Sequence, residues 1–295
     1  MTTFGLTAGA HYLKSFNIFR TKSGETKKNV EILQQHMPPV IQRMLPKRQQ
    51  LNILSVGSAE GEKDMIILKI IKEELQKSDH GEQIKIFNRA IEPNDYSCGL
   101  YKAAIENLPS PLEDQRIEFE ICQQTFQEYQ KSMKEPVKFD IIHFIHSIYY
   151  MDVEQTLRYC FKKELSDGGV FVFMVQCPDL LYWILLKQRK HWHGEEVASE
   201  TYETAEKLIQ IANENGWKHE VYTQEYSIDV TEVFVPKSTE GNLLLDFLTH
   251  TVNFRETGDK RLVEETLSLI KDLTIVKDGK RLGEKKESLI VIYKK

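Results

Sequence analysis

The sequence contains no apolar run long enough to cross a membrane. A spanning helix needs about 18 or more consecutive apolar residues, and no stretch of the 295-residue chain reaches that length. Its first residues also lack the apolar core of a secretory leader. We therefore expect a cytoplasmic protein that has no membrane partner.

Cysteine and basic charge are also scarce. The four cysteines are scattered, with no CxxC pair, which argues against both a disulfide framework and a zinc site. The net charge of −5 gives no general attraction to nucleic acid, and the short lysine clusters are interleaved with acids. We expect free thiols, no metal and no nucleic-acid partner.

What the sequence does contain is an alternation of strand-like and helix-like patterns between about residues 51 and 175. Such an alternation predicts βαβ units and an α/β fold with a Rossmann-like, doubly wound sheet. Asp167-Gly168-Gly169 reads as the stop of a helix before the fifth strand. The expected strands are 52–56, 84–91, 116–121, 139–145 and 169–175, and the expected helices are 62–75, one after residue 94 and one from about residue 125.

The rest of the chain mixes helices with two further strands, at 218–226 and at 288–293. No linker rich in proline or glycine divides the sequence, so we expect interlocked lobes. A cofactor-binding domain is predicted at 49–178 plus 280–295. A smaller helical or mixed substrate lobe with a lid is predicted at 1–48 and 179–279.

The first strand runs into Gly57-Ser58-Ala59-Glu60-Gly61-Glu62. Small residues at a strand-to-helix turn let the backbone approach a ligand, and the helix start offers free N–H groups. Alone, this pattern is compatible with a bare tight turn or with a dinucleotide site.

Glu92 ends the second strand about thirty residues later. A carboxylate there can accept both hydroxyls of an adenosine ribose, in a nicotinamide or an S-adenosylmethionine site. The turn lacks GxGxxG, and its acidic Glu60 and Glu62 would repel a pyrophosphate but tolerate a cationic sulfonium. The pattern therefore favours an S-adenosylmethionine pocket.

At this point several motifs together resemble the histamine N-methyltransferase family, nearly from end to end. The resemblance implies a class I methyltransferase fold, S-adenosylmethionine as cofactor, S-adenosylhomocysteine as product, and a monomer. The motifs are Ile53-Leu-Ser-Val-Gly57, Gly61-Glu62-x-Asp64, Glu92-Pro93, Phe139-Asp140-x-Ile142-His143, Tyr149-Tyr150, Asp246-Phe247-Leu248-Thr249, Asn253-Phe254 and Ser288-Leu-Ile-Val-Ile292.

The resemblance also implies roles for particular residues. Glu25 would bind the ammonium of a small amine, inside a box of aromatic rings that suits cations. The aromatic residues are Phe16, Phe19, Tyr149, Tyr150, Trp183 and Phe247. The expected cofactor residues are Gly57, Ser58, Gly61, Glu62, Glu92, Pro93, Ser97, Thr125, Phe126 and Ile145.

Two substrate positions depart from the family pattern. His146 stands where the family has a glutamine, and the region of Lys285 stands where it has an asparagine. His146 is either a polar rim residue, an acceptor for the departing proton, or a contact for a carboxylate on another substrate. The expected catalytic residues are Glu25, His146 and Tyr150.

The expected reaction is direct in-line methyl transfer to the neutral nitrogen of histamine or a related amine. Other interpretations are a methyltransferase for a different small amine, a catalytically silent amine-binding relative, a nicotinamide oxidoreductase and a nucleic-acid methyltransferase. The missing GxGxxG and the acidic charge weigh against the last two.

Overall fold

The computed structural model describes residues 9–78, 81–132, 137–199 and 205–295, so the first eight residues and residues 200–204 of the expected substrate lobe lie outside it. The chain forms two compact units. The larger unit consists of Val30–Val175, Ala205–Tyr222 and Ser288–Lys295, and the smaller unit consists of Met1–Asn29, Gln176–Thr204 and Thr223–Glu287. Strands β6 (Lys218–Asp229) and β8 (Lys280–Tyr293) have residues in both.

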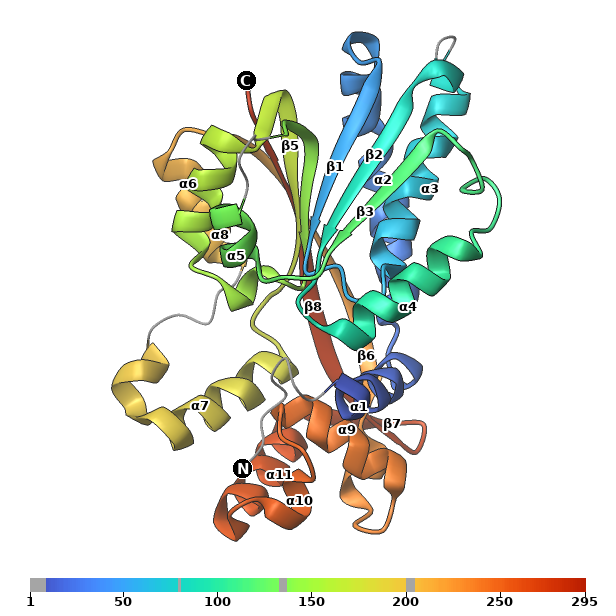
Figure 1. The fold of residues 1–295 in the computed structure, drawn as a ribbon. Helices are drawn as coiled ribbons and strands as arrows, with labels where there is room; N and C mark the ends of the chain where they lie inside the picture. Colours follow the sequence, from blue (N-terminus) through green and yellow to red (C-terminus); the bar gives the residue numbers. More distant parts are fainter. Residues whose placement is uncertain (1–8, 79–80, 133–136, 200–204) are drawn as a thin grey trace. The chain divides into compact units, whose positions relative to one another are not determined.

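The larger unit is built on a sheet whose strands lie in the order β3-β2-β1-β4-β5-β8-β6. Strands β3, β2, β1, β4 and β5 pair in parallel. Figure 1 shows α2, α3 and α4 on one side of this sheet and α5, α6 and α8 on the other. The bounds are α2 Glu25–Met44, β1 Gln50–Val56, α3 Glu62–Gln76, β2 Lys85–Ile91, α4 Asp95–Glu106, β3 Ile117–Cys122, α5 Phe126–Ser132, β4 Phe139–Ile145, α6 Val153–Lys163, β5 Leu165–Gln176 and α8 Ala205–Glu214.

The expected α/β fold with a doubly wound sheet is confirmed, and the predicted strand at 139–145 has the bounds of β4. Apolar side chains of β1, β2, β4 and β5 form one core with α2 and α3, which explains why these strands read as almost continuously apolar. Strand order reverses between β1 and β4, and Val56 of β1 lies opposite Ile91 of β2. The residues that follow these strands therefore meet at one sheet edge, where ligands of such sheets bind.

The predicted helix stop at Asp167-Gly168-Gly169 is wrong. Helix α6 ends at Lys163, and β5 already begins at Leu165. Between the pairs Phe139 with Leu165 and Ile141 with Val170 the register shifts. The positive φ of Gly168, 75°, is thus part of a bulge in the strand and not a helix C-cap.

The smaller unit packs helices against β7 and the neighbouring residues of β6 and β8. Its apolar core joins α1, α7, α9 and α11. The bounds are α1 Gly9–Lys22, α7 Leu180–Ser199, α9 Thr239–Thr249, α10 Phe254–Thr257, α11 Lys260–Asp272 and β7 Thr274–Lys277.

Candidate active site

The glycine turn after β1 is shaped by left-handed backbone at three positions. Gly57, Ala59 and Gly61 have φ of 72°, 48° and 81°, a region that glycine enters freely but alanine rarely. A Cβ on Gly57 would lie 2.4 Å from Cβ of Ser147, the second residue after β4. The hydroxyl of Ser147 donates to the Val56 carbonyl, so the two strand ends are joined at the reversal in strand order.

The turn leads into the start of α3, whose N-cap is Gly61. Glycine has no side chain, so Gly61 makes no side-chain cap hydrogen bond to α3, and the start of a helix favours a negatively charged ligand group. Ser58 is 8% exposed and, among the described residues, its Oγ has no hydrogen-bond partner. A buried hydroxyl of this kind fits a site that a polar ligand completes.

The Glu92 carboxylate, which follows β2, lies beside the same turn. Its Oε2 accepts the Ala59 N–H and its Oε1 accepts the Asn94 N–H, both at 2.9 Å. Burial raises the pKa of this carboxyl group, and the two backbone donors oppose that rise. Each carboxylate oxygen can accept a further hydrogen bond, so Glu92 can still receive hydroxyl groups. The turn and Glu92 together fit the adenosine and amino-acid parts of S-adenosylmethionine.

Other expected cofactor residues lie near the neighbouring strand ends. Ser97 is buried in the first turn of α4, where its N–H donates to the Asn94 side chain. Thr125 and Glu128 form reciprocal hydrogen bonds that cap α5. Phe126 is 3% exposed, and its ring packs edge-on against Phe144 at 6.2 Å. Pro93, Glu62 and Ile145 are half-buried beside these positions in sequence.

His146 follows β4 with a φ of 54°, a strained backbone conformation for this residue type. Its N–H donates to the Met174 carbonyl at 2.9 Å, and its Nδ1 lies 3.5 Å from the Tyr149 hydroxyl. Tyr150 is 69% exposed. The larger unit therefore brings the glycine turn, Glu92 and the segment from His146 to Tyr150 to the same sheet edge.

In the smaller unit, three of the expected aromatic residues form one cluster. The Phe247 ring lies 4.6 Å from Phe19 and 5.5 Å from Phe16, between centroids. Tyr12, which sequence analysis missed, stacks on Phe16 at 5.8 Å, and its spacing of four residues from Phe16 along α1 was an available signal. Trp183 contacts Tyr182 and is 45% exposed.

Glu25, at the start of α2, is only 2% exposed and belongs to a chain of buried hydrogen bonds. Asn29 Nδ2 donates to Glu25 Oε1 at 2.9 Å, and Gln224 Nε2 donates to Asn29 Oδ1 at 2.7 Å. Gln224 also lies 3.4 Å from Glu287, which accepts the Tyr226 hydroxyl at 2.5 Å. Burial raises the pKa of Glu287 and that of Tyr226. Of the residues in this hydrogen-bonded network, the sequence predicted only Glu25 as a site residue.

Lys285 is 1% exposed and forms a buried ion pair. Its Nζ lies 2.6 Å from Asp179 Oδ2, which also accepts the Lys286 N–H. An ammonium held in this way is already neutralised by its partner.

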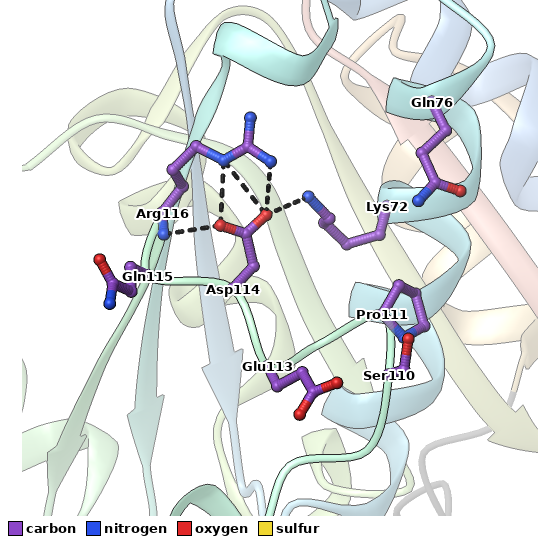
Figure 2. Close-up of a pocket in the computed structure, with 8 residues that line it drawn as sticks. All are labelled: Lys72, Gln76, Ser110, Pro111, Glu113, Asp114, Gln115 and Arg116. Atoms are coloured by element: carbon purple, nitrogen blue, oxygen red, sulfur yellow. Dashed lines mark hydrogen bonds and ion pairs between the residues drawn. The ribbon is translucent and has the colours of Figure 1, made fainter.

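One cavity of about 620 Å³ lies elsewhere in the larger unit. Figure 2 shows its centre, where the Asp114 carboxylate accepts hydrogen bonds from Lys72 at 2.5 Å and from Arg116 at 2.7–3.1 Å. These cations hold the pKa of Asp114 well below its usual range. Arg116 immediately precedes β3, so the cavity is at the amino end of that strand, opposite to where such sheets bind ligands.

In the described part of the chain, no helix is long and apolar enough to cross a membrane. No group of three or more histidine, cysteine or acidic side chains in the same residues is placed to hold a metal ion.

Comparison with known proteins shows the family of this chain. A family model described as a methyltransferase domain matches residues 30–221. Histamine N-methyltransferase of Rattus norvegicus is 29% identical over 290 residues, which cover 96% of this chain and 95% of that protein. Carnosine N-methyltransferase 2 of Gallus gallus is 29% identical over 255 residues, covering 85% of this chain and 76% of that protein.

Solved structures support the fold alone. The YcgJ protein of Bacillus subtilis superposes with a TM-score of 0.51 at 11% identity, covering 87% of this chain and 98% of that one. A proposed methyltransferase of Bacillus halodurans C-125 gives a TM-score of 0.50 at 11% identity, with the same coverage.

Proposed function

Because this chain belongs to the methyltransferase-domain family and is an S-adenosylmethionine-dependent enzyme, we propose that it methylates a nitrogen of a small amine, histamine or a related imidazole or biogenic amine. The observation that carries the proposal is Glu25, a carboxylate 2% exposed. A carboxylate pairs with a substrate ammonium through a charge-assisted hydrogen bond, and such an interaction is stronger away from bulk water. The similarity to histamine N-methyltransferases extends over the whole region that contains it.

Bound S-adenosylmethionine supplies the methyl group on an activated sulfonium. In the proposed donor site, the turn from Gly57 to Glu62 receives the polar tail and Glu92 accepts the ribose hydroxyls. The two fixed backbone N–H donors on Glu92 hold its oxygens in place, so little ordering remains to be done when the donor binds.

In the proposed acceptor site, Glu25 orients the substrate by its ammonium. Methyl transfer itself requires a neutral nitrogen of the substrate about 3 to 3.5 Å from the methyl carbon, in line with the leaving sulfur. Phe16, Phe19 and Phe247, which lie together in the smaller unit, would favour a cation.

We assign to His146 the proton that leaves the methylated nitrogen. Histidine is the side chain that most often serves as a general base in enzymes, and the Nδ1 atom of His146 lies 3.5 Å from the Tyr149 hydroxyl. The left-handed backbone of His146 supports this role, because strain of this kind gathers at functional sites.

The experiment that tests the function is calorimetry with S-adenosylmethionine, followed by a methyl-transfer assay with histamine, carnosine and other biogenic amines. Turnover of histamine would support the family's activity. Turnover of another amine alone would mean that His146 and Lys285 have redirected specificity. Cofactor binding without any turnover would favour the silent amine-binding relative, and no cofactor binding would contradict the proposal.

A further inference from the structure

A buried polar network lies directly behind the glycine turn, on the side of α3 and α4. Its centre is Asp64, in the first turn of α3 and 1% exposed. Asp64 Oδ1 accepts the Ser55 hydroxyl of β1 at 2.8 Å, and Oδ2 accepts the Tyr101 hydroxyl of α4 at 2.6 Å. Asn88 of β2 donates to the same Tyr101 oxygen at 3.1 Å. One carboxylate thus ties together four elements that converge on the turn.

The ring of Tyr101 supports the turn itself. A Cβ placed on Gly61 would lie 2.4 Å from both Cδ2 and Cε2 of this ring, so the backbone of Gly61 rests against the aromatic face. Tyr101 is completely buried, and its hydroxyl is held by Asp64 and Asn88 at once. The ring can therefore shift only if the network yields.

Fold stability alone does not account for this arrangement. Among the described residues, no lysine or arginine forms an ion pair with Asp64; its one charged-type neighbour is His143, whose Nε2 lies at 3.6 Å. Burial lowers the pKa of His143, which favours its neutral form. Burial of a carboxylate among mainly neutral donors lowers the stability of a core, and a protein with apolar residues of similar volume at such a position is often at least as stable.

We propose that Asp64 and Tyr101 are positioning residues of the methyl-donor site, which hold the Gly61 turn and the start of α3 in the conformation that binds S-adenosylmethionine. This inference rests on the proposed assignment of the donor to that turn. Asp64 acts through Tyr101, and Tyr101 acts through the backbone of Gly61. The negative charge of Asp64 also interacts favourably with the positive N-terminal end of the α3 dipole. This interaction helps to hold the start of α3 in place.

The test compares Tyr101→Phe, Asp64→Asn and the double variant by calorimetry with S-adenosylhomocysteine and by steady-state kinetics. Tyr101→Phe keeps the supporting ring but frees it from Asp64 and Asn88. We expect its Kd for S-adenosylhomocysteine and its KM for S-adenosylmethionine to rise about three- to tenfold, the range for one hydrogen bond. The KM for the amine should change less than about twofold, because the network lies behind the donor turn.

The matched control is Tyr129→Phe. Tyr129 is equally buried in the same unit, and its hydroxyl also has two partners, Glu164 at 3.2 Å and Arg89 at 3.3 Å. We expect a similar loss of thermal stability from this variant but an unchanged Kd. If Tyr101→Phe lost stability in the same way and also kept its Kd, the network would be merely structural and the inference would be overturned.

Coupling gives a second readout. If Asp64 acts through Tyr101, the double variant should bind S-adenosylhomocysteine about as weakly as the weaker single variant. Fully additive losses would contradict the proposed chain of contacts. If Asp64→Asn does not fold, the comparison of the Kd for S-adenosylhomocysteine between Tyr101→Phe and Tyr129→Phe still tests the positioning role.

Glu92→Gln separates this inference from the donor-site assignment. Weaker binding in Glu92→Gln together with normal binding in Tyr101→Phe would reject the positioning role alone. Normal binding in both would reject the donor site and the positioning role with it.

Discussion

The carboxylate of Glu92 and the backbone N–H of Ala59 lie 2.9 Å apart, which joins the end of β2 to the turn that follows β1. Ala59 has a φ of 48°, a conformation that this residue type seldom adopts. The hydrogen bond from Glu92 helps to hold the turn in that state. Glu92 therefore has two tasks in the proposed donor site: it shapes the turn and it accepts the ribose hydroxyls.

Replacement of Glu92 by glutamine is expected to weaken S-adenosylhomocysteine binding about 10- to 100-fold. An amide offers one oxygen where the carboxylate offers two, so its NH2 group must face a backbone donor. The loss corresponds to about 1.5 to 3 kcal/mol for a hydrogen bond to a charged group. Calorimetry measures it. Glu118→Gln, which makes the same charge change at an exposed position of β3, should bind normally, and equal affinities for both variants would contradict the assignment.

The bounds of the donor-site elements were predictable because local rules decide them. Helix α4 begins after Asn94, whose side chain accepts the Ser97 N–H as an N-cap should. The bulge around Gly168 was not predictable, because Asp-Gly-Gly can end a helix or interrupt a strand, and the pairing with β4 decides between them.

The interior network of the smaller unit was hidden for a related reason. Gln224 lies in a predicted strand and Glu287 directly precedes another, and sequence patterns alone place such polar residues on a solvated face. Only strand pairing and packing bring them to Asn29 and Glu25. Glu25 itself was predicted from a family resemblance, since its position in sequence is that of an ordinary surface glutamate.

Glu25→Gln should raise the KM for the amine substrate about tenfold or more and leave the Kd for S-adenosylhomocysteine unchanged. The amide can still accept from Asn29, so the fold is preserved while the charge that pairs with an ammonium is lost. Steady-state kinetics with varied amine measures the effect. Glu31→Gln, an exposed position on the same helix, serves as the control, and an unchanged KM in Glu25→Gln would rule out the anchor.

Two glycines provide a matched test of the turn. At Gly57, with φ of 72°, a Cβ would lie 2.4 Å from that of Ser147, so Gly57→Ala should destabilise the protein by about 1 to 3 kcal/mol. At Gly99, inside α4, a Cβ meets nothing within 4 Å. Gly99→Ala should instead stabilise by up to about 1 kcal/mol. Thermal unfolding of both variants measures the contrast, and a stabilising Gly57→Ala would contradict the turn geometry.

His250 predicts a pH dependence of stability. Burial lowers the pKa of this histidine to about 4, below the value of about 6.5 in an unfolded chain. Between these two pH values the unfolded state binds a proton at His250 that the folded state does not bind. The free energy of unfolding is therefore unaffected by this histidine above about pH 6.5 and decreases as the pH falls toward 4. The test variant is His250→Asn, because asparagine tolerates the left-handed backbone of this position, where φ is 50°. Urea unfolding at several pH values should show a smaller acid loss in the variant, and identical profiles would refute the prediction.

His146→Asn tests the proposed proton acceptor. Asparagine tolerates a φ near 54° and carries no basic nitrogen, so the variant removes a base while keeping the turn. General-base catalysis contributes a rate factor of about 10² to 10⁴ where proton transfer limits the rate. We therefore expect kcat of His146→Asn to fall by up to a factor of that size.

The split between kcat and KM distinguishes a base from a binding contact at His146. Loss of a base lowers kcat, whereas loss of a contact made equally in the ground state and the transition state raises KM alone. A half-buried histidine of the same unit, His219 on β6, gives the matched substitution His219→Asn, which should keep kcat. If His146→Asn raised only the KM for the amine, His146 would be a substrate contact, and the proton would leave directly to water.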